Sequence, residues 1–494
     1  GSARGGIPHA IDQEPESPAC REVFTPMIFA DLIFLYLFLP ANLLLYYFSG
    51  SRSWRNGILV IFSLLFYAWG EPVYLLLLLF SVGLNYLYGR VIELLRGTPQ
   101  AGLALAVILF IDLGLLGVFK YSGLAVETVN SLLGLSLPVP RLSLPIGISF
   151  YTFQIISYII DVYRGECLAQ RSFSKFLLFV SLYHQLVAGP IVRYTEIAER
   201  IDSRTESWNG IARGFDRFFI GLLKKVAIAN TAGKLAAPYL DGPAGSLTVL
   251  GGWFGALLFS LQIYYDFSGY SDMAIGLGEM FGFSHPENFD YPYVSRSATE
   301  FWRRWHMTLG RFFRDYLYIP LGGNRRRMVL NLMLTWFATG LWHGASWNFV
   351  LWGLYYGVLI LLERLFLGKL LERLPRLISH CYLLLAVLFG WILFYFTSLD
   401  RAAAYMGRML GFGGAPLYDL PTLVDLANNC FWLLFAVLFC MPVARWFGDQ
   451  VRSLSEAGQS AVLRVRPALN LLLLALCTAL LAGQSYNPFL YFRF

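Results

Sequence analysis

Long apolar runs dominate this sequence and constrain its fold more than any other feature. Residues 27–48 read MIFADLIFLYLFLPANLLLYYF, and a helix of that length crosses roughly 30 Å of hydrocarbon at a rise of about 1.5 Å per residue. Comparable runs follow approximately at 57–69, 72–94, 101–119, 144–162, 175–190, 210–230, 247–267, 329–343, 347–366, 380–397, 430–446 and 467–484. The pattern predicts an all-α fold, a polytopic transmembrane helical bundle with about 11 to 13 membrane-embedded helices.

The composition agrees with a membrane protein. The chain is 57% hydrophobic and 14% charged, whereas ordinary soluble domains are about 25% charged. Its net charge of +7 comes from short basic runs between apolar segments, at 52–56, 223–225, 324–327 and 464–466. Such runs are typical of positive-inside loops that face anionic headgroups, so we expect membrane lipids as partners and no nucleic acid.

The domain organisation is simple. Residues 1–26 are polar, are rich in Gly, Pro and Glu, and lack the apolar core of a signal peptide. We expect them to be a flexible leader or an expression remnant, followed by one membrane domain over 27–494. The six cysteines form no CxxC pair, so neither a disulfide framework nor a metal site is predicted.

Some apolar runs are too short or too polar to be simple spans, notably those near residues 144, 175 and 265. We expect broken or re-entrant helices there, because irregular backbone at membrane depth must pack in protein or face a wet cavity. Between about 268 and 328 no clean span is found. A connection this long is usually functional or disordered, and its many aromatic residues argue against disorder.

His343 is the first candidate for chemistry. It ends the apolar run VLNLMLTWFATGLW and is followed by another. An ionisable group at such depth is costly unless it is paired or faces water, so it is a functional candidate, and a neutral imidazole can take a proton from a hydroxyl. The alternative is a histidine hydrogen-bonded at a helix junction beside Gly340 and Gly344, glycines that would let a neighbouring helix or a substrate approach closely.

His306 is the second candidate, in the segment EFWRRWHMTLGRFFRDYLY (300–318). If this segment is one helix, Glu300 can pair with Arg303 or Arg304, and Arg311 with Asp315. The alternative to a catalytic role is an amphipathic interfacial helix whose histidine bonds to a backbone carbonyl.

The stretch QIYYDFSGYSDMAIG (262–276) places hydroxyls and carboxylates between apolar flanks. Such groups must line a cavity, bind an ion or satisfy one another, and we favour a lining role. The residues predicted to bind substrate or line the tunnel are Tyr265, Asp266, Ser268, Tyr270, Asp272, Trp342, Asn348, Arg303, Arg304 and Arg311. No Walker A loop, HExxH or GxSxG motif occurs, so nucleotide hydrolysis and zinc hydrolysis have no visible apparatus.

Seven blocks occur in an order that resembles the membrane-bound O-acyltransferase family, and especially its bacterial alginate O-acetyltransferase type. They are SYIIDVYRG, AGPIVRY, YYDFSGYSDMAIG, EFWRRWH, RDYLYIPLGGNR, GLWHGASW and the closing YNPFLYFRF. The resemblance implies a ring of tilted helices around a central tunnel, with His343 as the catalytic residue and His306 as a second polar position. Many relatives carry another histidine where this chain has Tyr356, so a relay through that position is in doubt and His306 is the candidate partner.

The resemblance implies a multi-pass enzyme of the bacterial inner membrane. It would take an acetyl group from a cytoplasmic thioester, acetyl-CoA or an acyl carrier protein, for O-acetylation of an exopolysaccharide, with no permanently bound cofactor. A periplasmic acetyltransferase and the polysaccharide machinery would be its partners. Two alternatives stay open: D-alanyl transfer from a carrier protein to teichoic acid, and an ion-coupled transporter or channel that uses Asp266, Asp272 and His343.

Overall fold

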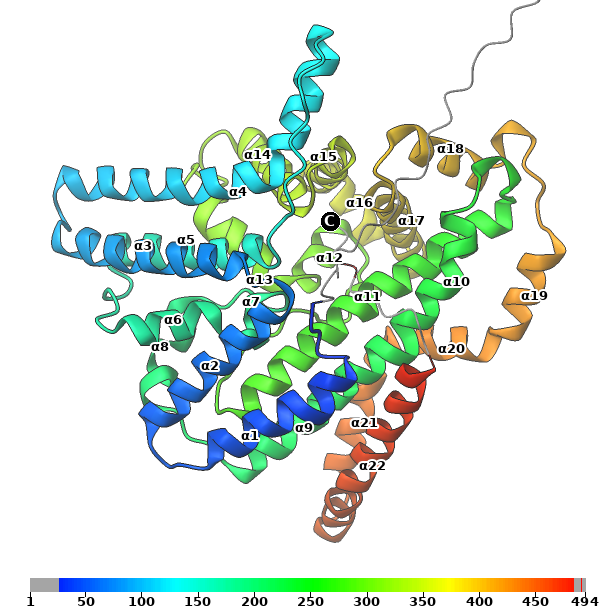
Figure 1. Ribbon diagram of the computed structural model, residues 1–494. Coiled ribbons are helices and arrows are strands. Elements are labelled where there is room, and N and C mark those ends of the chain that lie inside the picture. Colours follow the sequence, from blue (N-terminus) through cyan, green and yellow to red (C-terminus); the bar gives the residue numbers. More distant parts are fainter. Residues whose placement is uncertain (1–25, 484–489, 491–494) are drawn as a thin grey trace, which may run out of the picture.

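The computed structural model describes residues 26–483 and 490, and over these residues the chain is helical with no strand (Figure 1). The expected leader at 1–26 lies, except for its last residue, outside the described part. The α-helices of the first half are α1 (Leu39–Tyr47), α2 (Arg52–Gly70), α3 (Tyr74–Leu94), α4 (Pro99–Leu133), α5 (Ile148–Arg164), α6 (Phe173–Ser181), α7 (Tyr183–Leu186), α8 (Tyr194–Ser203), α9 (Trp208–Leu223), α10 (Asn230–Leu240) and α11 (Val249–Met280).

The second half continues with the helices that surround the aromatic motifs of the sequence. They are α12 (Ala298–Arg304), α13 (Met307–Phe313), α14 (Met328–His343), α15 (Trp347–Leu362), α16 (Gly368–Arg373), α17 (Arg376–Tyr395), α18 (Leu399–Met409), α19 (Leu420–Asn428), α20 (Cys430–Phe439), α21 (Val443–Arg452) and α22 (Glu456–Ala482). Short π or 3-10 turns join or extend them: η1 (Phe34–Phe38), η2 (Lys224–Ala229), η3 (Ala244–Ser246), η4 (Pro292–Val294), η5 (Arg314–Tyr318), η6 (Glu363–Leu367) and η7 (Phe412–Gly414).

Fewer helices are long and apolar enough to cross a membrane than the sequence predicts. Within the described residues five meet that test, or up to six if the bent pair α19 and α20 counts as one span. The predicted number of 11 to 13 membrane-embedded helices is therefore not confirmed. Several predicted spans form helices too short to qualify, and the run at 175–190 is split between α6 and α7, as expected for a broken helix.

Helix α11 is the central element. It packs against α9 and α10, and nearly all of its side chains are buried. Its first half belongs to a core cluster formed with α15, α17 and α18, whereas its second half belongs to the cluster formed with α1, α2 and α5–α9. The predicted break near residue 265 is wrong, because α11 continues through residue 280 as one helix.

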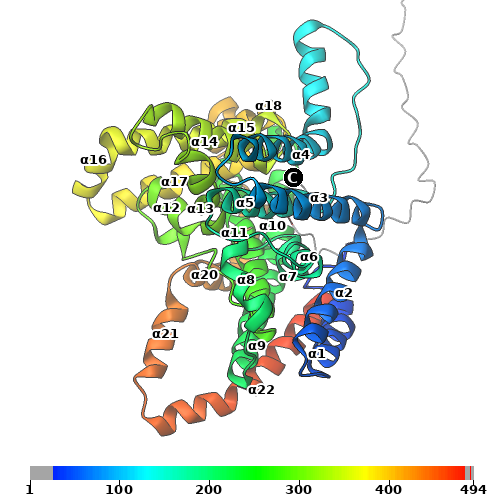
Figure 2. The ribbon, with the colours of Figure 1, turned by 90° about the vertical axis from the view of Figure 1, so that its left-hand side faces the viewer.

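The outer elements surround this centre. Figures 1 and 2 both show α3, α4 and α5 side by side, and α21 and α22 extending away from the body. Helices α14 and α15 pack against each other, and α12 contacts α13, α15 and α17. The segment 268–328 contains no predicted span. Its first residues belong to α11, and the rest supplies short helices that meet the ends of longer ones.

Candidate active site

His343 is the last residue of α14, and Gly344 after it has extended backbone. Helices α14 and α15 approach closely just before this point. A Cβ on Gly340 would collide with the carbonyl oxygen of Phe349, and one on Gly353 would lie 2.9 Å from the Cα of Gly340. The expectation that Gly340 admits a neighbouring helix is confirmed, and the contact fixes the end of α14.

Aromatic rings surround the imidazole of His343. Its ring centroid lies 4.8 Å from that of Trp352 and 5.4 Å from that of Phe394, both edge-on. The His343 residue is only 6% exposed. This packing holds the ring in one orientation, which a proton-transfer group requires.

His306 lies at a break in the backbone. Helix α12 ends at Arg304, Trp305 is extended, and His306 has a φ of 43° before α13 begins at Met307. The predicted continuous helix over 300–318 is therefore wrong. A left-handed conformation is unfavourable for a residue with a Cβ and occurs most often where the surroundings enforce it, as at functional sites.

Asn288 holds His306, and no motif in the sequence points to this residue. The Nδ1 atom of His306 lies 3.1 Å from Oδ1 of Asn288, which also accepts hydrogen bonds from the backbone amide of Thr308 at 3.3 Å and from its hydroxyl at 2.9 Å. Because a backbone amide can only donate, this Asn288 atom is an acceptor, and His306 must donate from Nδ1. The Nε2 atom of His306 then carries the lone pair, and it has no hydrogen-bond partner among the described residues.

Trp342 brings the two histidines together. Its indole ring lies 5.0 Å from the imidazole of His343 and 6.0 Å from that of His306. The far side of the indole packs on Phe150 and Phe153, at 5.4 and 5.5 Å. Two imidazoles from distant parts of the sequence thus flank one buried ring.

A cavity of about 610 Å³ borders this site. Its wall includes His306 and, from α12, α14 and η6, the side chains of Trp302, Trp336, Thr339 and Arg364. His343 and Trp342 are not part of that wall. The volume is that of a typical small-molecule site.

Arginines line the same cavity. Arg303 and Arg311, both predicted at the site, are in its wall together with Arg314. Arg311 lies 3.4 Å from Glu196, rather than pairing with Asp315 as predicted, whereas Arg303 makes no ion pair within the described residues. Arg304 is outside the wall and forms the predicted i,i+4 pair with Glu300 at 3.1 Å.

Lys120 and Tyr121 of α4 bind the end of α14. The Lys120 ammonium donates to the carbonyl oxygen of Trp342, and the Tyr121 hydroxyl donates to that of Leu341 at 2.7 Å. These are carbonyls that a helix end leaves without intrahelical partners. The sequence signal was present, since a lysine inside a long apolar run is rarely there without a role.

Glu363 fixes the start of α12. Its buried carboxylate accepts hydrogen bonds from the amides of Ala298 at 2.6 Å and Thr299 at 2.8 Å, from the Thr299 hydroxyl at 2.6 Å, and from Tyr382 at 3.1 Å. An anion at this position satisfies the free amides of the first turn. Glu363 therefore sets the position of the helix that leads into His306.

Tyr356 occupies the position for which the family resemblance implies a further histidine. It is fully buried, and its ring lies 4.9 Å from Trp302 and 5.5 Å from Trp352. Gly390 of α17 leaves room for its hydroxyl. In this chain the position belongs to the aromatic wall between α12, α15 and α17.

The remaining predicted lining residues lie elsewhere. Asp272 pairs with Arg217 at 2.9 Å and with Lys224 at 2.5 Å, and Asp266 pairs with Lys225 at 2.6 Å. The others are also buried outside the cavity wall, so their lining role stays a prediction: Tyr265, Ser268, Tyr270 and Asn348.

Asp266 also reaches the described residue near the C-terminus, because its other oxygen accepts from the Leu490 amide at 2.9 Å. Metal chemistry has no candidate among the described residues, which contain no group of three or more His, Cys, Asp or Glu side chains able to hold an ion.

Comparisons with known proteins identify the relatives of this chain. The model of the membrane-bound O-acyltransferase family matches residues 164–401, which include both histidines. The probable alginate O-acetylase AlgI of Pseudomonas putida is 39% identical over 495 residues, covering 95% of this chain and all of that one. The peptidoglycan O-acetyltransferase of Helicobacter pylori is 34% identical over 80% of this chain and 82% of its own length.

A more distant match is the teichoic acid D-alanyltransferase of Streptococcus thermophilus, 30% identical over 45% of this chain and 58% of its own. The similarity to the O-acetylating relatives extends over far more of the chain. The expected family and membrane character are thereby confirmed. This chain belongs to the membrane-bound O-acyltransferase family and is a multi-pass membrane O-acyltransferase.

Proposed function

We propose that this enzyme moves an acetyl group from a cytoplasmic thioester across the bacterial inner membrane for the O-acetylation of an exopolysaccharide. Two relatives that align over most of the chain, a probable alginate O-acetylase and a peptidoglycan O-acetyltransferase, support acetyl as the group and a cell-surface polymer as its destination. A periplasmic acetyltransferase would complete the transfer to the polymer.

The observation that carries the proposal is the pair of imidazoles around Trp342. His343 and His306 come from separate helix ends, and both are buried. A buried histidine is costly unless it is used or satisfied, and His306 faces a cavity of about 610 Å³ with an unprotonated Nε2. This is an arrangement suited to holding and passing a proton.

The chemistry requires one base. His343 accepts the proton of the accepting hydroxyl as its oxygen attacks the thioester carbonyl carbon. The new C–O bond forms, the C–S bond breaks, and the proton passes to the leaving sulfur to give a thiol. His306 positions the donor or shares that proton.

The arginines of the cavity would receive the donor. Guanidinium groups bind phosphates by two parallel hydrogen bonds, and coenzyme A and phosphopantetheine carriers both present phosphates. Arg303 is the best placed, because it lines the cavity and makes no ion pair within the described chain. The basic run at 324–327 precedes α14 and supports a cytoplasmic mouth for this cavity.

The test uses the full-length protein in membranes with radiolabelled acetyl-CoA. His343→Gln should remove transfer to within background, and His306→Ala should lower it by about 10²-fold or more. Lys369→Ala, an exposed site on α16, serves as the control that expression and handling leave activity intact. Undiminished transfer by folded His343→Gln would refute the assignment, whereas labelling only from a D-alanyl carrier would favour teichoic acid as the destination.

A further inference from the structure

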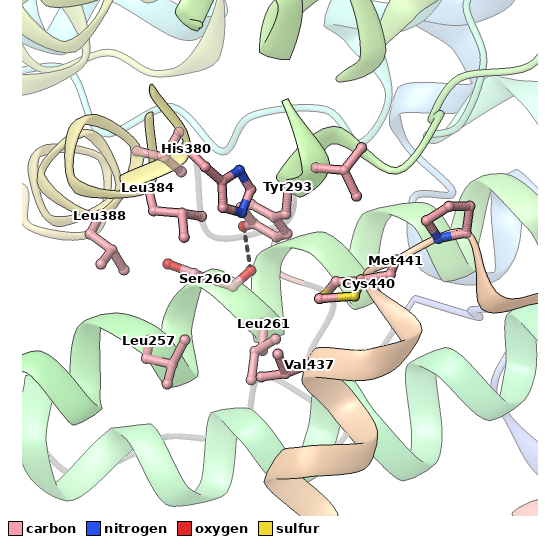
Figure 3. Close-up of a pocket in the computed structure, with 13 residues that line it drawn as sticks. Leu257, Ser260, Leu261, Tyr293, His380, Leu384, Leu388, Val437, Cys440 and Met441 are labelled. Carbon is pink, nitrogen blue, oxygen red and sulfur yellow. Dashed lines mark hydrogen bonds between the residues drawn. The ribbon is translucent and has the colours of Figure 1, made fainter. Parts of the chain in front are cut away.

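A second cavity, of about 410 Å³, lies away from the candidate active site (Figure 3). Figure 3 shows His380, Leu384 and Leu388 of α17 facing Leu257 and Leu261 of α11 across it. The end of α20 and the turn η4 complete the wall. The cavity is therefore built from elements that are far apart in the sequence.

Tyr293 of η4 separates this cavity from the aromatic wall of the active site. Its hydroxyl donates to the carbonyl oxygen of Ser260 at 2.7 Å and accepts from the indole of Trp391 at 3.1 Å. Its ring also lies 6.0 Å from Phe301 and 6.4 Å from Trp305. The two cavities have no lining residue in common.

The lining of the second cavity is almost entirely hydrocarbon. Leucine and valine side chains of α11, α17 and α20 form its sides. The few polar groups already have partners: Nδ1 of His380 lies 2.9 Å from the carbonyl oxygen of Ser295, and the thiol of Cys440 lies 3.4 Å from that of Ala436. Such a lining suits an alkyl chain, and its volume is within the range of ligand sites.

The position of α17 places this cavity beside lipid. Helix α17 is one of the candidate membrane spans, and Leu385, on the next face from Leu384, is 46% exposed. An apolar cavity that borders a bilayer is open to the bilayer's own chains. Water has little to gain there because the wall offers it few polar atoms.

Arginines near the cavity indicate the charge of a lipid headgroup that would fit there. Arg376 precedes His380 by four residues, so it continues the stripe of α17 that lines the cavity, and it is exposed without an ion pair among the described residues. Arg445 of α21 follows the cavity-lining Pro442 by three residues and is also exposed, although it pairs with Asp290 at 2.7 Å. Apolar walls with arginines at the rim are complementary to an anionic phospholipid.

We propose that this cavity is a specific site for an anionic phospholipid, with one acyl chain between α11, α17 and α20 and the phosphate at Arg376. The apolar walls hold the chain, and the arginine selects the charged headgroup. The site is independent of the proposed acyl transfer, because it uses none of the residues of that reaction.

Native mass spectrometry of the full-length protein in detergent tests the site, with added phosphatidylglycerol and phosphatidylcholine as probes. We expect one tightly held phosphatidylglycerol per chain. Leu384→Trp, which fills the cavity, should weaken it by more than tenfold because the ligand loses buried methylene groups. Leu385→Trp is the matched control, one residue further along α17 and exposed to the bilayer, and should bind as the unaltered protein does.

The headgroup is tested separately. Arg376→Glu should lower phosphatidylglycerol affinity by about fivefold or more and leave phosphatidylcholine unchanged, while the exposed Lys369→Glu should change neither. Unaltered binding by Leu384→Trp or by Arg376→Glu would overturn the proposal. Equal retention of both lipids would also overturn it. A second copy of the chain in the cavity would overturn it as well, and would appear as a dimer that Leu384→Trp dissociates.

Discussion

Replacing Asn288 should disable the site without touching either histidine. Asn288→Ala removes the acceptor shared by the Nδ1–H group of His306 and by the amide and hydroxyl of Thr308. The Thr308 hydroxyl can rotate, so the main loss falls on two buried N–H groups, each costing about 1–3 kcal/mol when left unsatisfied. We expect the free energy of unfolding to fall by about 2–6 kcal/mol.

The kinetic effect should be larger than stability alone explains. Without Asn288, nothing fixes which nitrogen of His306 carries the proton, and a misplaced proton removes the lone pair from the cavity side. General acid–base groups contribute about 10²–10⁴-fold, so kcat for acetyl transfer should fall by at least 10²-fold while KM changes little.

Asn288→Asp separates positioning from packing. A carboxylate still accepts the Nδ1–H bond, so activity should be much higher than in Asn288→Ala. It also favours the protonated imidazole and raises the pKa of His306. Because the lone pair is needed, the acidic limb of the kcat profile should move to higher pH.

The assay is the pH dependence of labelled acetyl transfer, measured beside thermal melting in detergent. Asn85→Ala is the matched control, a buried asparagine of α3 bonded to Asp112 at 2.9 Å and remote from the site. It should lower the melting temperature and leave the shape of the pH profile unchanged. If Asn288→Ala and Asn85→Ala lose activity only in proportion to stability, the positioning role is refuted.

Three further predictions concern the framework. Glu363→Ala should cost about 3 kcal/mol by leaving the first amides of α12 without an acceptor, lowering both the melting temperature and the transfer rate, while Glu363→Gln should lose less. Gly340→Leu should abolish the monodisperse peak in size-exclusion chromatography because the leucine side chain would collide with α15. Gly114 has no neighbour within 4 Å of the position that a Cβ would take, so Gly114→Ala should leave the free energy of unfolding unchanged or raise it by up to about 1 kcal/mol. Glu206 lies in the loop between α8 and α9. Burial alone would raise the pKa of its carboxyl group, but hydrogen bonds from Arg52 and Tyr46 hold that pKa below its usual value. The ionised Glu206 carboxylate stabilises the fold fully above about pH 4.3. This stabilisation is lost as the pH falls through the lower pKa of the folded state. Glu206→Gln has no such carboxylate, so its melting temperature should fall less at acidic pH.

The helical class and the choice of the two histidines as candidates both follow from the sequence for the same physical reason. Apolar runs must be helical at membrane depth, and a histidine among them needs an explanation. What could not be predicted is where backbones break. The segment 300–318 has helical periodicity, yet the helix breaks at His306, where Asn288 from the preceding loop binds both His306 and Thr308.

The predicted break in the polar stretch of α11 is wrong for a related reason. Its carboxylates could either break the helix or be neutralised, and the sequence does not say which. In the structure two cations of η2 reach them, Lys224 at Asp272 and Lys225 at Asp266. Their charges are satisfied from the side, and α11 continues unbroken.

Both histidines stand at helix ends, and this placement has a physical reason. A residue inside a helix has its backbone groups bonded to the same helix, so its neighbours are set by a regular repeat. At an end, free carbonyls and amides must find partners elsewhere, and here those partners are Lys120 at α14 and Glu363 at α12. Each therefore ties a helix that ends at or just before one of the histidines to another part of the bundle. The site is accordingly fixed by long-range contacts to helix ends, and substitutions at these two remote anchors should move the imidazoles relative to Trp342 more than substitutions within the helices themselves.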